Sequence, residues 1–125
     1  MVKVDTSENL TRFIFSKNDF RSSDEHVRYS AFMPPSNKLL SVFRIFDLAD
    51  PEVWELGDKV GILRERTLLA RADIKVSNVN DSGLDVDAND DPPRHANIVG
   101  WPEEKSEIKL KAIELADRAQ LHLRR

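Results

Sequence analysis

Side chains able to do chemistry are concentrated in one segment of this sequence, Arg94-His95-Ala96-Asn97-Ile98-Val99-Gly100-Trp101-Pro102. The segment places a guanidinium, an imidazole, an amide and an indole just before Pro102. We expect a helix to begin at Pro102, and a helix N-terminus can itself bind an anion. In a functional interpretation, Arg94 holds a phosphate or carboxylate as a bidentate donor and His95 moves a proton near neutral pH. Asn97 then adds an amide to the ligand site, and Trp101 offers a stacking face.

A structural alternative remains open for the same segment. Ala96, Ile98 and Trp101 would be core residues, His95 would bond to the backbone, and Gly100 would make the turn that admits the helix. Arginine and histidine are often neighbours by chance, and a catalytic role depends on geometry that a sequence does not contain.

A second histidine, His26, lies in the polar stretch of residues 16–28, which we expect to be a loop. Together with His95 it would form an acid and base pair of the kind that cleaves phosphodiesters, if the fold brings the two together. Arg28 and Tyr29 would then contact a phosphate and a base. The alternative is a solvated polar loop, which is the commoner role of such a composition.

Metal and cofactor sites are not indicated. The chain has no cysteine, and none of its three histidines has the helical spacing of a zinc motif. The acidic residues 85–91 alternate like calcium ligands, but Asp90 stands where the loop needs glycine and Ala96 where it needs glutamate. Glycine-rich phosphate loops and nucleophile elbows are absent. We therefore predict no metal and no cofactor.

Composition excludes several classes of protein. A hydrophobic share of 40% and a charged share of 33% are typical of a folded chain. The net charge is −3, and residues 80–91 carry five aspartates without a base, so no basic stripe favours nucleic acid. No apolar run is long enough to span a membrane, and the first residues are too polar for a signal peptide. We expect a cytoplasmic protein.

Hydrophobic periodicity predicts the order of the elements. Apolar runs and alternation predict strands at residues 12–15, 39–46, 68–77 and 84–88, with residues 29–33 extended before two prolines. Asp50-Pro51-Glu52 predicts the start of a helix that ends at Gly61, with the Asp50 side chain as its cap. The turn residues Asn80-Asp81-Ser82-Gly83 predict a hairpin between the last two strands.

The C-terminal region reads as one long amphipathic helix from Pro102 to the end of the chain. Its apolar stripe, Ile108, Ala112, Ile113, Leu115, Ala116, Ala119 and Leu123, is expected to pack on a sheet. Leu110 and Leu121 fall outside the stripe, as a second contact surface or as two exposed leucines. Together, these elements predict an α+β fold: a small, mostly antiparallel sheet of four or five strands, packed by a short middle helix and this long C-terminal helix. Residues 11–125 form one domain after a polar lead, residues 1–10, that is a candidate for disorder.

Four segments resemble a family of short, uncharacterised bacterial proteins: Leu40-Ser41-Val42-Phe43-Arg44-Ile45, Glu55-Leu56-Gly57-Asp58, Ala70-Arg71-Ala72-Asp73-Ile74 and residues 92–102. Their most specific feature is the motif Arg-His-Ala-Asn-Ile-x-Gly-Trp-Pro. The resemblance implies a bacterial origin and no activity.

Two kinds of function stay open. The first is a non-enzymatic accessory or protein-interaction domain, with a protein partner or a second copy contacting Leu110, Leu121 and the region of Phe32 and Met33. The second is a small metal-independent enzyme or binding protein that acts on a phosphorylated or nucleic-acid ligand through Arg94, His95 and His26.

Overall fold

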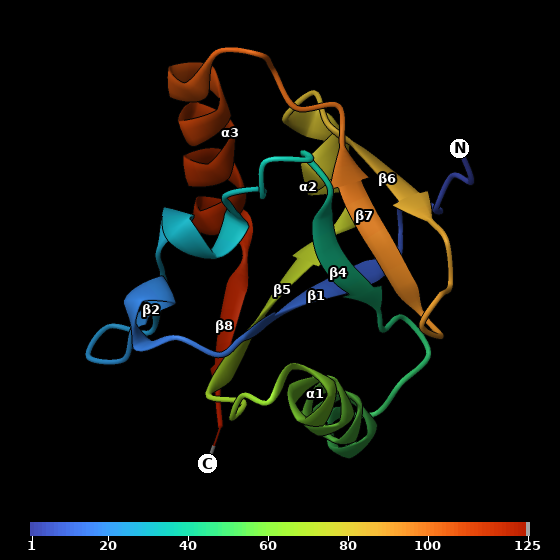
Figure 1. The fold of residues 1–125 in the computed structure, drawn as a ribbon, viewed down its shortest axis with the longest axis vertical. Coiled ribbons are helices and arrows are strands. Elements are labelled where there is room, and N and C mark those ends of the chain that lie inside the picture. The colour runs from blue at the N-terminus through green and yellow to red at the C-terminus, as the bar shows by residue number, and fades with distance from the viewer. Residues whose placement is uncertain (125) are drawn as a thin grey trace.

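The structure, a computed structural model, describes residues 1–124 and is an α+β fold built on one antiparallel sheet (Figure 1). The six strands run in the order β6-β7-β4-β1-β5-β8. They are β1 (Asn9–Ile14), β4 (Leu40–Arg44), β5 (Ala70–Lys75), β6 (Asp85–Ala88), β7 (His95–Val99) and β8 (Gln120–Leu123). The helices are α1 (Asp50–Arg64), α2 (Val76–Asp81) and α3 (Lys105–Arg118). A separate pair of short strands, β2 (Phe20–Arg21) and β3 (His26–Val27), lies between the 3-10 turns η1 (Lys17–Asp19) and η2 (Tyr29–Phe32). The expected fold class is confirmed, with six strands in the main sheet instead of four or five.

The alternation of side chains along the strands divides the core between the two faces of the sheet. One face packs with α2, α3 and η2 in a cluster that includes Leu10, Val42, Ile98, Phe32 and Leu115. The other face packs against α1 through a smaller cluster: Phe13, Phe43, Ile45, Val53, Val60 and Leu68. The smaller cluster leaves part of that second face, on β4, β7 and β6, open to polar side chains.

Helix α1 lies very close to the sheet at Gly57. A Cβ atom there would stand 2.7 Å from both the Phe13 ring and the Leu68 side chain, so only glycine fits. Toward β8, three side chains spaced four apart on α1, Asp50, Trp54 and Asp58, meet two arginines. We call these five residues the arginine ladder.

The arginine ladder ties α1 to β5 and to the end of β8. Arg71 of β5 donates to Asp50 (2.8 Å) and lies over the Trp54 ring, 4.7 Å from its centre. Arg124 donates to Asp58 (2.7 Å) and lies 5.1 Å from the same ring centre. Arg71 is only 2% exposed, and two of its nitrogens, Nε and Nη1, are buried without a hydrogen bond. The buried charge therefore depends on its few carboxylate and ring contacts.

Helix ends differ from expectation. The residue before α1 is Ala49, and Glu52 accepts its N–H group (3.0 Å), while the Asp50 carboxylate turns to Arg71 instead of capping the helix. The helix also continues past Gly61 to Arg64. α3 begins three residues later than Pro102, at Lys105.

The predicted hairpin between the strands at residues 68–77 and 84–88 is wrong. β5 ends at Lys75, and Val76 and Val79 are buried on the short helix α2, whose three-residue spacing the alternation of β5 had obscured. The turn residues end α2, with Gly83 at a φ of 81°. β6 then pairs with β7, not with β5. β7 itself, at residues 95–99, had been expected as the approach to a helix.

The C-terminal helix stops at Arg118, and the next residues form the strand β8, which pairs with β5. Leu121 is therefore buried opposite Ala72, and Leu123 lies opposite Ala70, outside any helical stripe. Leu110 is 61% exposed on α3. Of the expected contact surface, Phe32 is fully buried in η2, because residues 29–32 turn into a 3-10 helix instead of extending.

The N-terminal lead is packed against the domain. The Val2 carbonyl accepts the Ala88 N–H (2.9 Å), and the backbone of Lys3 forms an isolated antiparallel β-bridge with Asp87. The lead therefore covers the free edge of β6 (Figure 1). Val4 is buried, and β1 begins at Asn9, inside the range expected as lead. No helix within residues 1–124 is both long and apolar enough to cross a bilayer.

Candidate functional site

His95 opens β7 and points onto the part of the sheet face that α1 leaves uncovered. Its Nε2 lies 2.8 Å from Ser41 Oγ, and its Nδ1 lies 2.7 Å from Asn89 Oδ1. Ser41 comes from β4 and Asn89 from the loop after β6, so three separate segments meet at one imidazole. Phe43 packs edge-on against the His95 ring, with centres 5.4 Å apart, and fixes its plane.

The direction of these hydrogen bonds follows from the backbone. The Asp91 N–H also donates to Asn89 Oδ1 (3.2 Å), so this side-chain atom must be the oxygen and not the amide nitrogen. The oxygen accepts, hence His95 Nδ1 carries a proton. In the neutral ring Nε2 is then an acceptor, and Ser41 donates its hydroxyl proton to it.

Two guanidinium groups contact Ser41 from opposite faces of the sheet: Arg64 reaches its hydroxyl, and Arg12, on the face of Leu10 and Ile14, reaches its main-chain carbonyl. Arg64, the last residue of α1, donates from Nη2 to Ser41 Oγ over 3.4 Å. Arg12 of β1 donates from Nη1 to the Ser41 carbonyl (2.9 Å) and from Nε to the Ala31 carbonyl (2.9 Å). Within residues 1–124, neither arginine lies within 4 Å of a carboxylate. On the face that carries the Ser41 hydroxyl, the charge of Arg64 is therefore not neutralised by an ion pair.

The electrostatics of the site agree with its geometry. Burial lowers the pKa of His95 below its usual value, and the charge of Arg64 lowers it further, against a smaller opposing effect of Asp91. Burial also lowers the pKa of Arg12 to about 10, helped by Arg64 and opposed by Asp19. His95 is thus neutral at pH 7, which is the form that accepts a proton, while both arginines stay charged.

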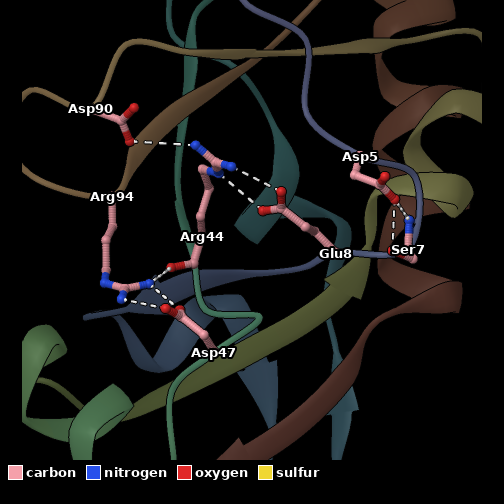
Figure 2. A network of polar contacts seen from close by, with 7 residues as sticks. All are labelled: Asp5, Ser7, Glu8, Arg44, Asp47, Asp90 and Arg94. Carbon is pink, nitrogen blue, oxygen red and sulfur yellow. Dashed lines mark hydrogen bonds and ion pairs between the residues drawn. The ribbon is translucent and has the colours of Figure 1, made fainter.

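Two other residues of the predicted site have structural partners. Arg94 binds Asp47 with two nitrogens, over 2.6 and 3.1 Å, and also donates to the Arg44 carbonyl (Figure 2). Its predicted bidentate anion is thus a carboxylate of the same chain. The buried Trp101 donates from Nε1 to the Ile98 carbonyl (3.0 Å), so its indole has no free stacking face.

The same close-up shows a second ion pair beside Arg94. Arg44 makes a two-point contact with Glu8 (2.9 and 2.8 Å), and Asp90 lies 3.6 Å from its Nη1 (Figure 2). These contacts join the residue before β1, the end of β4 and the loop after β6, and they hold that loop where Asn89 can reach His95.

Asn97, also predicted as a ligand-binding residue, lies on the same sheet face as His95. It stands directly across from Ser41 on β4 and from Asp87 on β6. The side chain is half-buried, so its amide is within reach of a group bound at Ser41.

The structure does not bring His26 and His95 together. His26 lies on β3, which packs against β8, whereas His95 is four strands away in the sheet. Four strand spacings amount to about 19 Å. A two-histidine acid and base pair therefore does not exist in this fold.

His26, Arg28 and Tyr29 do line one common hollow of about 510 Å³, with Asn18, Arg21 and Ser30. Arg21 is paired with Asp24 in this hollow (2.6 Å), and Lys109 stands over one face of the Tyr29 ring (4.8 Å). The loop interpretation thus grouped residues that are neighbours, at a place separate from His95.

Sequence reasoning found His95 and Asn97 but missed Ser41, Asn89, Arg64 and Arg12. Ser41 and Arg12 had only been placed within predicted strands, and Arg64 lay beyond the predicted end of α1. One signal was available: Ser41 interrupts the apolar run of residues 39–46 with a polar side chain. Its partner could not be named without the pairing of β4 with β7.

Acidic residues 85–91 serve local contacts. Asp87 accepts the Val2 N–H (2.9 Å), and Asp90 faces Arg44. In the part of the chain that the structure describes, no group of three or more histidine, aspartate or glutamate side chains is arranged to hold a metal ion.

Comparison with known proteins found no matching family model, no matching curated protein and no matching solved structure. The function must therefore be argued from the site itself.

Proposed function

We propose that this protein is a binding domain that recognises an anionic group, a phosphate ester first of all, on the open sheet face around Ser41. The observation that carries the proposal is Arg64, which donates to the Ser41 hydroxyl on this face and has no ion-pair partner among residues 1–124. Because no carboxylate occupies the Arg64 guanidinium, its donors are available to an anionic group bound at Ser41.

Phosphate fits the donors better than a carboxylate does. Arg64 is exposed at the end of α1 and has a planar fork of N–H groups, which matches two phosphate oxygens. The Asn97 amide stands on the strand next to Ser41 and adds a neutral donor on the same side. A tetrahedral group with three or four acceptors can use all of these donors at once.

Binding of this kind breaks no bond, so it is compatible with the interpretation of the chain as an accessory domain. A phosphorylated partner protein or a phosphorylated small molecule would present the same group. Partner, oligomeric state, bacterial origin and cytoplasmic location stay predictions.

A titration of the protein with phosphoserine, inorganic phosphate and sulfate, followed by the backbone amide signals of the ¹⁵N-labelled chain, tests this function. We expect the signals of Ser41, His95 and Asn97 to move. Arg64→Gln removes one charge-assisted hydrogen bond and should weaken binding by about 10-fold or more. Lys59→Gln removes the same charge from an exposed position on the same helix and should leave affinity unchanged.

Two results would refute the function. One is the absence of shifts at β4 and β7 at millimolar phosphate. The other is an equal loss of affinity in Lys59→Gln and Arg64→Gln, which would reduce the effect to net charge.

A further inference from the structure

A chain of three side chains leads from Asn89 through His95 to Ser41, and every hydrogen bond in it points toward activation of the serine. We propose that Ser41 is a nucleophile that takes up a phosphoryl group from a phosphate ester, with His95 as its base and Asn89 as the residue that positions His95. This inference rests on the proposed function, because Arg64 must first hold the phosphate.

The polarity of the chain is the first argument. Asn89 Oδ1 is fixed as an acceptor by the Asp91 N–H, which leaves His95 Nε2 as the atom that receives the Ser41 proton. A serine, a neutral histidine and a third group that orients the histidine make up the general arrangement of an activated nucleophile. The distances of 2.8 and 2.7 Å lie within the range that proton transfer requires.

The surrounding charge is the second argument. Attack on an anionic phosphate is slow unless the charge of its oxygens is neutralised, and the cation beside the Ser41 hydroxyl is Arg64. Arg64 sits on the solvent side, where the non-attacked oxygens of a bound phosphate would lie. It also favours the alkoxide form of Ser41 as the proton leaves.

Strand pairing does not require these side chains. β4 and β7 are already joined by their backbone register from Leu40 and Ile98 to Phe43 and His95. The hydrogen bonds among Ser41, His95 and Asn89 are additional to this backbone pairing, at positions where two apolar residues would pack as well.

The reaction balances without a further reagent. Ser41 Oγ attacks phosphorus, its proton passes to His95 Nε2, the bond from phosphorus to the ester oxygen breaks, and the departing alkoxide takes the proton from His95. Water then attacks the phosphoserine, gives a proton through His95 to Ser41 Oγ, and releases inorganic phosphate.

A fluorophosphonate probe tests the nucleophile directly. The probe loses fluoride when a serine oxygen bonds to its phosphorus, so labelling is a phosphoryl-type transfer that intact mass and peptide mapping can locate. We expect one adduct, on Ser41, in the full chain. Ser41→Ala should abolish labelling, and His95→Ala should slow it by about 100-fold or more. Ser36→Ala, at an exposed turn position, should label at the rate of the parent protein.

Asn89 needs a test that a merely structural residue would not pass. Asn89→Ala should slow labelling by about tenfold or more, and Asn89→Asp should restore it because a carboxylate also accepts the Nδ1 proton. The rate in Asn89→Asp should rise at a higher pH than in the parent, since the new negative charge raises the pKa of His95. The other charged groups that act on His95 are Arg64 of α1 and Asp91 of the β6–β7 loop, and neither changes in this variant.

The outcomes separate the two proposals. Phosphate binding at β4 and β7 without any Ser41 adduct overturns the nucleophile and leaves the binding function in place. A Ser41 adduct without phosphate binding overturns the binding function and, with it, the transfer from a phosphate ester, because the inference rests on that function. An adduct on another serine, or equal labelling of His95→Ala and the parent, also overturns the inference.

Discussion

Replacement of Arg71 by methionine should show what the arginine ladder contributes to stability. Methionine keeps most of the aliphatic stem and removes the guanidinium. Asp50 is 77% exposed at its side chain and regains water, so its loss as a partner costs little. Asp73 is the sensitive group: its carboxylate lies 3.3 Å from Arg71 Nε, it is largely buried, and His122 at 3.4 Å is the partner that remains.

The size of the effect follows from these contacts. An uncompensated buried charge costs about 3–5 kcal/mol, and the ring contact with Trp54 adds about 1 kcal/mol. Against this, Arg71 has two buried nitrogens without hydrogen bonds, whose removal returns about 1–3 kcal/mol. We therefore expect Arg71→Met to lower the free energy of unfolding by about 3 kcal/mol, or about 10 °C in melting temperature for a domain of this size.

A double variant gives the decisive comparison. Arg71→Met with Asp73→Val removes both buried charges, and an apolar pair in place of a buried ion pair is often neutral. Urea unfolding of the parent, both single variants and the double variant measures the coupling. We expect the double variant to lie within about 1 kcal/mol of the parent. A double variant as unstable as Arg71→Met, or an Arg71→Met that loses less than about 1 kcal/mol, would show that the buried charge of Asp73 is not what matters.

Three further predictions concern packing, protonation and the C-terminal strand. Gly57→Ala should lower stability by about 1–3 kcal/mol in urea unfolding because its Cβ meets the sheet, whereas Lys59→Ala on the same helix should stay within about 0.5 kcal/mol; equal effects would contradict the close approach. The lowered pKa of His95 means that the folded state binds its proton less readily than the unfolded state does. The contribution of His95 to the free energy of unfolding is therefore complete above about pH 6.5 and falls as the pH drops through the folded pKa. In a plot of this free energy against pH, His95→Asn should flatten that part of the curve, and an unchanged slope would count against the lowered pKa of His95. Leu121→Ser should cost about 2 kcal/mol or more because the Leu121 side chain is buried, whereas Leu110→Ser should cost almost nothing because Leu110 is exposed; the reverse order would favour one continuous helix instead of β8.

Local chemistry was enough to predict several elements. Period-two alternation located the strand that became β5, and the apolar run around Val42 located β4, because these patterns depend on neighbours in the chain. Asp50, Pro51 and Glu52 marked the start of α1 for the same reason, although the partner of Asp50 was a distant arginine. Boundaries were less secure, since Val76 fits the end of a strand as well as the start of a helix.

Pairing in space was beyond the reach of the sequence. Gln120 to Leu123 is compatible with the last turn of a helix, and only the free edge of β5 turns it into a strand. Likewise, the turn at Gly83 signals a reversal, but nothing local says that β6 will pair with β7 across the sheet from β5. Such choices are settled by the burial of a whole sheet face and not by any single segment.

The site shows the same division. By itself, the sequence determined that His95 and Asn97 stand close together, that no thiol is available for chemistry, and that polar groups crowd the approach to the last helix. The tertiary structure alone decided that Arg94 is neutralised by Asp47, that His26 lies far from His95, and that Ser41, Asn89 and Arg64 surround the imidazole. The reason is physical: a hydrogen bond depends on the position of two atoms in space, and residues 41 and 95 become neighbours only when β4 and β7 pair.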